Sequence, residues 1–357
     1  MDPSSSVSVV PSVSSPDETK LLTQLVENPA DSDARLRYAS WLEEQGETER
    51  AEYLRHLDQV YDSVGSEREG DEDQDEDEEP DSWSRLVGGP LIEGFADIDF
   101  PVELRDLWLS FAKPALIYKQ EPWAEDLSDT EDPSPVGSTK MFGHPDLPSG
   151  STWPTQKDCN AFYMDDSGIP AETPCGFVCQ FNLADFAGTQ AGRHFPNQGL
   201  LSIFACAELE SIGMVDALVL YTEDVEGLER MVPPAELMGE DANEDNRILP
   251  VERLSFSETL ELPDPDRDSV FEALRESSDE YQDELSWMLE EAGSRELDSL
   301  LGYTRCTTGG DPLPGPDWCK LICVETSVEI VLHICIRKED LAAGRLDQVQ
   351  LAWVDFG

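Results

Sequence analysis

The stretch that decides the fold runs from Ser138 to Ala207. It opens with the sequence STKMFGHPDLP (138–148), continues through GFVCQFNL (176–183) and includes GLLSIF (199–204). The prolines and glycines predict turns, and the two apolar runs predict strands. Two polar amides, Gln180 and Asn182, stand inside the first strand. The stretch therefore predicts neighbouring strands of a sheet, entered through a tight turn.

Helices and further strands are predicted on both sides of this stretch. Pro101 to Phe111 has apolar residues at helical spacing and is stopped by a following Lys-Pro. Ala115 to Tyr118 is a short strand candidate. Amphipathic helices are expected between Asp266 and Ser299, before the last apolar runs. Such a mixture predicts an α+β domain with mixed or antiparallel sheets.

A weak internal repeat is visible in the apolar runs. The runs of the first half are echoed in the second in three pairs: 176–185 with 318–327, 198–205 with 328–337, and 217–221 with 348–354. Each half would supply about three strands. We therefore expect sheets built from two related halves, which is an internal duplication.

The N-terminal part of the chain predicts a separate helical unit. Ser15-Pro16 begins a first helix that ends at Asn28-Pro29, Asp31 or Ser32 can cap a second that closes at Gly46, and a third covers 47–61. These predict a disordered arm over 1–16, a small three-helix all-α domain over 17–62, an acidic disordered linker over 63–98 and the α+β domain over 99–357. The acidic tract alternates Asp as a calcium loop does, but Glu76 occupies the position where that loop needs glycine.

Charge limits the classes of partner. The net charge is −53, and the acidic residues are spread beyond the 11 that lie in Ser66–Asp81. Such a chain repels phosphate backbones and anionic lipids, so we expect neither nucleic-acid nor membrane binding. No signal peptide or apolar span is recognisable, which predicts a cytoplasmic protein whose eight cysteines are mostly reduced.

Two resemblances to known families follow from these motifs. The residues around Tyr38-Ala39-Ser40-Trp41-Leu42-Glu43-Glu44 resemble the repeat-companion domain found at the N-terminus of many planctomycete-type bacterial proteins, over about 19–60. The rest, from about residue 99, resembles the YwqG-like family of uncharacterised cytosolic proteins. The matching positions include Lys140, Gly143, Pro145, Leu147, Pro148, Trp153, Pro154, Gln180, Asn182, Leu183, Gly199, Leu200, Leu201, Phe204, Leu300-Leu301-Gly302-Tyr303 and Ile336-Arg337-Lys338-Glu339-Asp340-Leu341. The first family implies an accessory or adaptor role, and the second implies no known activity.

The candidate ligand-binding residues are Trp153, Gln180, Asn182, His144 and His194. Gln180 and Asn182 point to one face of their strand and need hydrogen-bond partners, either in the backbone or in a bound ligand, and the backbone is favoured. Cys175, Cys179, Cys319 and Cys323 have a spacing that zinc sites use, but their place in apolar strands favours plain packing.

These patterns favour a non-catalytic protein-binding or adaptor module. The resemblance to the YwqG-like family implies an immunity-type role against a toxin as one version of it. The partner would be another protein, and no catalytic residue, cofactor or metal is predicted. The alternative is a small-molecule binder or an enzyme that uses a cleft between the two halves, lined by the five candidate residues. The sequence names neither the partner nor the ligand.

Overall fold

The structure is a computed structural model of the chain. It describes residues 15–62, 80–98, 100–124, 127–128, 131–159, 169–208, 214–238, 246–263, 281–291, 298–304, 313–325 and 330–356. The predicted N-terminal arm up to residue 14, most of the acidic tract, and the predicted helix around Val270 to Leu274 lie outside these residues.

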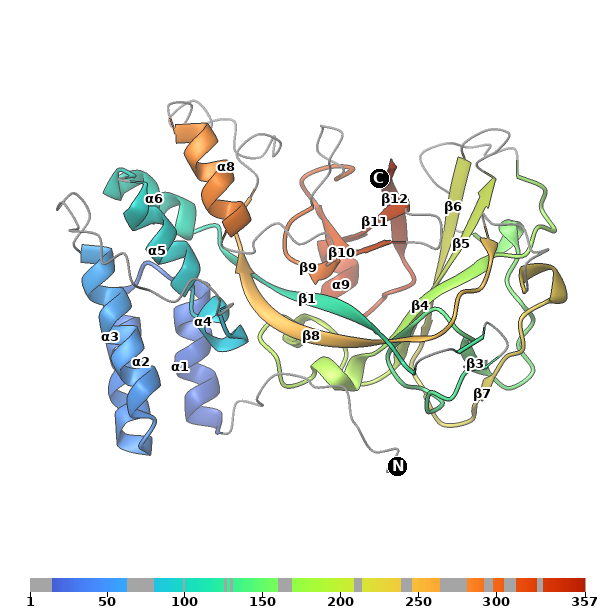
Figure 1. Cartoon of the computed structure of the whole chain (residues 1–357), viewed down its shortest axis with the longest axis horizontal. Coiled ribbons are helices and arrows are strands. Elements are labelled where there is room, and N and C mark those ends of the chain that lie inside the picture. Colours follow the sequence, from blue (N-terminus) through green and yellow to red (C-terminus); the bar gives the residue numbers. More distant parts are fainter. Residues whose placement is uncertain are drawn as a thin grey trace.

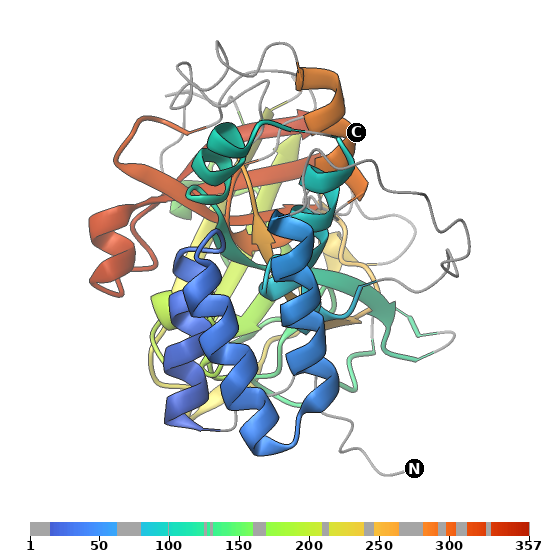
Figure 2. The ribbon, with the colours of Figure 1, turned by 90° about the vertical axis from the view of Figure 1, so that its left-hand side faces the viewer.

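Three helices at the N-terminus form an antiparallel group, blue in Figure 1 and nearest the viewer in Figure 2. They are α1 (Pro16–Glu27), α2 (Ser32–Gln45) and α3 (Thr48–Asp62). The side chain of Ser15 caps α1, that of Asp31 caps α2, and Gly46 ends α2 in the left-handed conformation. The three helices are therefore confirmed with the predicted caps.

The predicted linker is wrong for its last residues. Three further helices lie there and just beyond: α4 (Ser82–Leu86), α5 (Gly89–Asp97) and α6 (Val102–Leu109). Trp83 and Phe95 in α4 and α5 are buried, and they share one hydrophobic core with α1 to α3. The signal for these helices is a short apolar pattern (Trp83, Leu86, Leu91, Phe95) that the neighbouring acidic run obscured. The first three helices thus pack directly against α4 and α5.

Within the described residues, ten strands form one sheet. Its order is β12-β11-β10-β9-β1-β8-β2-β4-β5-β6, and every pairing in it is antiparallel. The strands are β1 (Lys113–Pro122), β2 (Lys140–Met141), β4 (Gly176–Asn182), β5 (Leu200–Glu208), β6 (Met214–Thr222), β8 (Glu252–Glu261), β9 (Ser299–Leu301), β10 (Trp318–Glu325), β11 (Ile330–Arg337) and β12 (Val349–Phe356). A second, two-stranded sheet joins β3 (Asp146–Pro148) to β7 (Leu228–Arg230).

The strand order shows the duplication. In chain order, β1, β2, β4, β5 and β6 correspond to β8, β9, β10, β11 and β12. The first strand of each half is exchanged, because β1 pairs with β9 and β8 pairs with β2. The long pair β1–β8 therefore lies at the centre, between the remaining strands of the two halves. The α+β class and the two related halves are confirmed.

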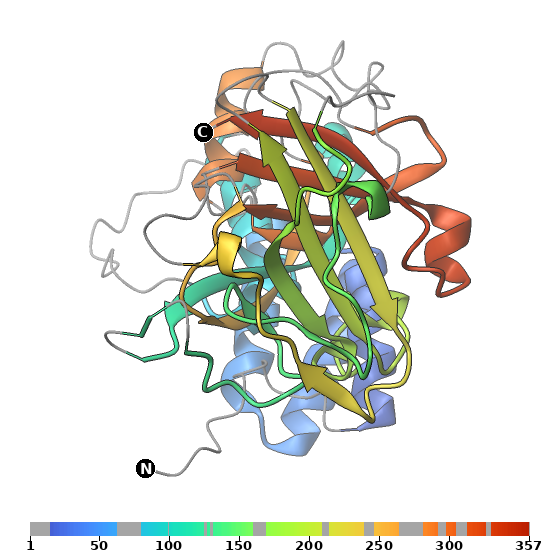
Figure 3. The ribbon, with the colours of Figure 1, turned by 90° about the vertical axis from the view of Figure 1, so that its right-hand side faces the viewer.

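The sheet bends so that its two halves face each other, as Figure 3 shows where β5 and β6 cross in front of β10 to β12. One hydrophobic core fills the space between them, with Ile203 and Val219 from one half and Ile322 and Ile334 from the other. A second core joins the helices, including α8 (Gln282–Glu291), to the end of β8. Burial of aliphatic side chains on both faces is what holds these layers together.

Candidate functional site

The two amides predicted as ligand-binding residues are satisfied inside the protein. The Gln180 side chain accepts from the Asp146 backbone N–H at 3.0 Å and donates to the Ser138 carbonyl oxygen at 2.7 Å. The Asn182 amide donates to the Gly137 carbonyl oxygen at 2.9 Å and caps the short helix η2 (Leu183–Phe186). Both tie the opening turn to β4. Most of these contacts are with the backbone, and the Gln180 amide also donates to the Asp146 carboxylate at 2.6 Å.

Next to Gln180 lies a buried cluster of two acids and two bases. Lys140 is fully buried, and its ammonium group is 2.8 Å from Asp132 and 3.4 Å from Asp146. Arg230 pairs with the same two carboxylates at 2.8 and 2.6 Å. Although burial alone raises the pKa of Asp132, the charge of Lys140 holds it below the usual value. The two bases and the two acids of the cluster are thus paired with one another inside the protein.

The second half of the sheet contains a related pair. The buried Lys320 lies 3.5 Å from Glu261 and donates to the Ser299 hydroxyl at 2.8 Å. Glu261 accepts the backbone N–H of Tyr303 at 2.7 Å, just as Asp132 accepts that of His144 at 2.8 Å. In both halves this N–H follows a turn of two residues with positive φ, Phe142-Gly143 and Leu301-Gly302.

Trp153 and His144 also lie among structural contacts. The Trp153 ring N–H donates to the Cys175 carbonyl oxygen at 2.9 Å, and the ring packs edge-on against Phe204. His144 is buried, and its carbonyl oxygen accepts from the ammonium of Lys140 at 2.5 Å. Of the five candidate residues, only His194 lines the cavity between the two halves.

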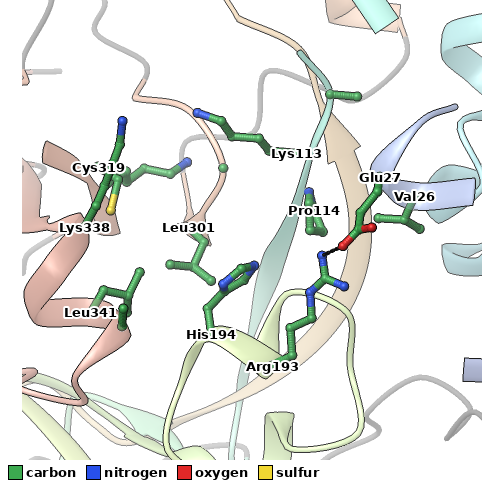
Figure 4. Close-up of a pocket in the computed structure, with 14 residues that line it drawn as sticks. Val26, Glu27, Lys113, Pro114, Arg193, His194, Leu301, Cys319, Lys338 and Leu341 are labelled. Carbon is green, nitrogen blue, oxygen red and sulfur yellow. Dashed lines mark ion pairs between the residues drawn. The ribbon is translucent and has the colours of Figure 1, made fainter. Parts of the chain in front are cut away.

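That cavity has a volume of about 510 Å³ and lies where the two halves meet α1 (Figure 4). Among the residues that line it are three lysines, one arginine, one histidine and one acid: Lys113, Lys320, Lys338, Arg193, His194 and Glu27. At the average composition of this chain, 14 lining residues would include about one base and about three acids. The lining is therefore rich in basic residues, whereas the protein as a whole is strongly acidic.

The lysines reach the cavity from three elements. Lys113 begins β1, and its ammonium lies 3.9 Å from the centre of the Tyr303 ring. Lys320 lies in β10, and Lys338 begins the short helix α9 (Lys338–Ala342), where its ammonium donates to the Pro316 carbonyl oxygen at 2.8 Å. In Figure 4 the ammonium groups of Lys113 and Lys338 lie at the same end of the cavity, next to Cys319.

Arg193 and His194 come from the tight loop η3 (Gly192–His194) between β4 and β5. The loop is held from β8, because the buried Glu258 carboxylate accepts the backbone N–H groups of Gln190 and Ala191 at 2.5 and 3.0 Å. Only glycine fits at position 192, since a Cβ there would lie 1.9 Å from a backbone oxygen. Arg193 points toward Glu27 of α1, at 3.3 Å.

The surroundings of the cavity shift the pKa values of two groups that line it, His194 and Cys319. Burial lowers the pKa of His194, and the neighbouring Arg193 lowers it further, although Glu27 acts in the opposite direction. Burial raises the pKa of the Cys319 thiol, although Lys113 and Lys338 act in the opposite direction. The basic side chains of the cavity other than His194 are those of its lysines and Arg193. Such a cavity can accept an anion, with the aliphatic walls of Leu301 and Leu341 beside it.

Sequence reasoning missed the lysines of this site. Their one signal was scarcity: the chain has only seven lysines, and three of them line this cavity. Among the described residues, the four cysteines considered for zinc are not part of any group of three or more His, Cys, Asp or Glu side chains that could hold a metal ion. Cys319 lines the cavity, whereas Cys175 and Cys179 belong to two different hydrophobic cores.

Comparison with known proteins places the chain in a family without an assigned activity. Within the described residues, no helix combines the length and apolar character needed to cross a membrane. A search of curated proteins found no match. A family model described as a domain of unknown function, DUF1963, matches residues 139–354 and so covers more than half of the chain. The chain therefore belongs to the DUF1963 family of domains of unknown function.

Proposed function

We propose that this protein binds an anionic small molecule in the cavity between the two halves of the sheet and α1. The carrying observation is the gathering of Lys113, Arg193, Lys320 and Lys338 around one cavity of a chain whose net charge is −53. Proteins usually recognise phosphate and carboxylate groups with basic side chains that converge in a concave site. The proposal is one version of the small-molecule alternative that the sequence left open, although of the five residues expected to line such a cleft only His194 lines this cavity.

The arrangement favours a compact anion at one end of the cavity. The ammonium groups of Lys113 and Lys338 contact an aromatic ring and a carbonyl oxygen, and they lie at the same end of the cavity in Figure 4. An anion between Lys113 and Lys338 would gain two charge-assisted contacts. Phosphate-bearing or polycarboxylate metabolites fit this description.

Titration calorimetry tests the proposal with phosphate, pyrophosphate and citrate at constant ionic strength. We expect saturable binding of at least one of them that weakens as salt is added. Lys113→Ala and Lys338→Ala should each reduce the affinity about tenfold, in line with the loss of one hydrogen bond to a charged group. Lys119→Ala is the matched control, because Lys119 is exposed on the same strand but does not line the cavity.

Glu27 supplies a test in the opposite direction. Its carboxylate holds Arg193 and competes with any anion that enters the cavity. Glu27→Gln should therefore strengthen binding severalfold. Equal affinities in the wild type and in the variants at positions 27, 113 and 338 would contradict the proposal.

A second candidate is the protein-binding role that the sequence favoured. The observation on its side is Trp287 of α8, which is 56% exposed, since exposed tryptophan is enriched at interfaces. Affinity capture with the wild type and with Trp287→Ala tests it, and an identical set of captured proteins would count against it. We also propose, on the motifs alone, a cytoplasmic bacterial protein with a repeat-companion head and a YwqG-like domain.

A further inference from the structure

Three of the eight cysteines gather beside the start of β4, away from the anion cavity. Cys159 follows the short helix η1 (Gln156–Asp158), Cys175 precedes β4, and Cys206 lies in β5. The sulfur atoms of Cys159 and Cys175 are 3.6 Å apart, which is van der Waals contact. Cys206 also lies against Cys175.

The backbone brings the two segments together. The residues around Thr155 run antiparallel to those around Pro174, and the two residues form a β-bridge. The Gln156 N–H donates to the Thr173 carbonyl oxygen at 2.9 Å, and the Cys175 N–H donates to that of Pro154 at 3.0 Å. The contact between the sulfur atoms is thus imposed by a ladder of main-chain hydrogen bonds.

The two sulfur atoms differ in access. Cys159 is partly exposed, whereas Cys175 is fully buried. Contact with the neighbouring thiols, together with burial, raises the pKa of Cys175 well above the usual value. An oxidant in solution therefore reaches Cys159 first, and Cys175 is the thiol next to the sulfur that has reacted.

We infer that Cys159 and Cys175 are an oxidation site, at which hydrogen peroxide converts the two thiols into a reversible disulfide. The Cys159 thiolate attacks peroxide, the O–O bond breaks, and sulfenic acid and hydroxide form; the hydroxide takes a proton to give water. The Cys175 sulfur then loses its proton and attacks the Cys159 sulfur, whose S–O bond breaks to release a second water. Two thiols lose two electrons in total, and one peroxide gains them.

The disulfide would close the chain between residues 159 and 175 into a ring. It would fasten the segment that carries η1 to the start of β4. This site is independent of the anion proposal, because none of its residues lines the cavity.

Peptide mapping of the full chain tests the inference. The reduced protein is treated with a small excess of hydrogen peroxide, alkylated, digested without reductant and analysed by mass spectrometry. We expect a cross-linked pair containing Cys159 and Cys175, about 2 Da lighter than the two free peptides, and loss of two alkylation sites that dithiothreitol restores. Cys319 is the internal control. Like Cys159 it is partly exposed, but its sulfur contacts the Ile336 carbonyl oxygen and not a thiol.

Variants separate the pair from its neighbour. Cys159→Ser should abolish the cross-link, and because the side chain is partly exposed this variant should fold. Cys206→Ser should keep the cross-link. Unchanged alkylation of Cys159 in treated wild type would overturn the inference, and so would a cross-link of Cys206 in place of Cys159, or a Cys159 that is lost no faster than Cys319.

Discussion

The buried cluster around Lys140 yields the sharpest prediction about stability. In Lys140→Met, Arg230 would remain as the one base against the carboxylates of Asp132 and Asp146, so one negative charge would stay buried and uncompensated. The carbonyl oxygen of His144 would also lose its donor. Removal of one partner from a buried ion pair costs about 3–5 kcal/mol, and we expect a loss in that range at pH 7.

A matched control comes from an exposed pair of the same geometry. Lys157 lies 2.9 Å from Glu172, and the two side chains are 51% and 80% exposed. Because water screens this pair, Lys157→Met should cost less than about 1 kcal/mol. The two variants thus differ in burial, while the distance and the chemical groups are nearly the same.

Urea unfolding followed by circular dichroism and tryptophan fluorescence measures both variants. The shift of the midpoint multiplied by the slope gives the change in the free energy of unfolding. The deficit of Lys140→Met should shrink as the pH falls toward 4, because the acids left without a base take up protons. A deficit no larger than that of Lys157→Met would refute the reasoning, since it would mean that the carboxylates are solvated.

Three further perturbations test other parts of the structure. Burial raises the pKa of Glu258 to about 7, so its contribution to stability is full below pH 4.5 and is lost as the pH rises through 7. Between pH 5 and 8 the wild type should therefore lose about 2–3 kcal/mol of unfolding free energy through this group. Urea unfolding at the two pH values should show that Glu258→Gln removes this loss. Gly302→Ala should cost more than about 2 kcal/mol, because its Cβ would lie 2.1 Å from Glu261 at positive φ, whereas Gly227→Ala, at positive φ in open space, should cost about 1 kcal/mol by the same assay. Asp31→Ala removes the cap of α2 and should cost about 1 kcal/mol, read from the thermal midpoint; an unchanged midpoint would contradict the capping role.

Local patterns were sufficient for much of the fold. Ser15, Asp31 and Gly46 mark helix ends because caps act within four residues of the chain. The repeat of apolar runs predicted the related halves, since strand patterning is also local. Where the apolar signal was short and lay beside a charged tract, as in residues 82–97, composition was misleading and the helices were missed.

Other features depend on the tertiary structure alone. In the sheet, β1 pairs with β9 of the other half, and β8 pairs with β2. The apolar periodicity of a strand does not show with which half it pairs, because the two halves offer similar edges. The cavity beside α1 joins Lys113, Arg193 and Lys338, and the sulfur contact joins Cys159 to Cys175; neither group forms a spaced motif. Sequence by itself determined the first three helices and the main strands of both halves, because the causes of these elements lie within a few residues. Folding decided which charges and thiols meet, because those contacts arise only when distant strands pack.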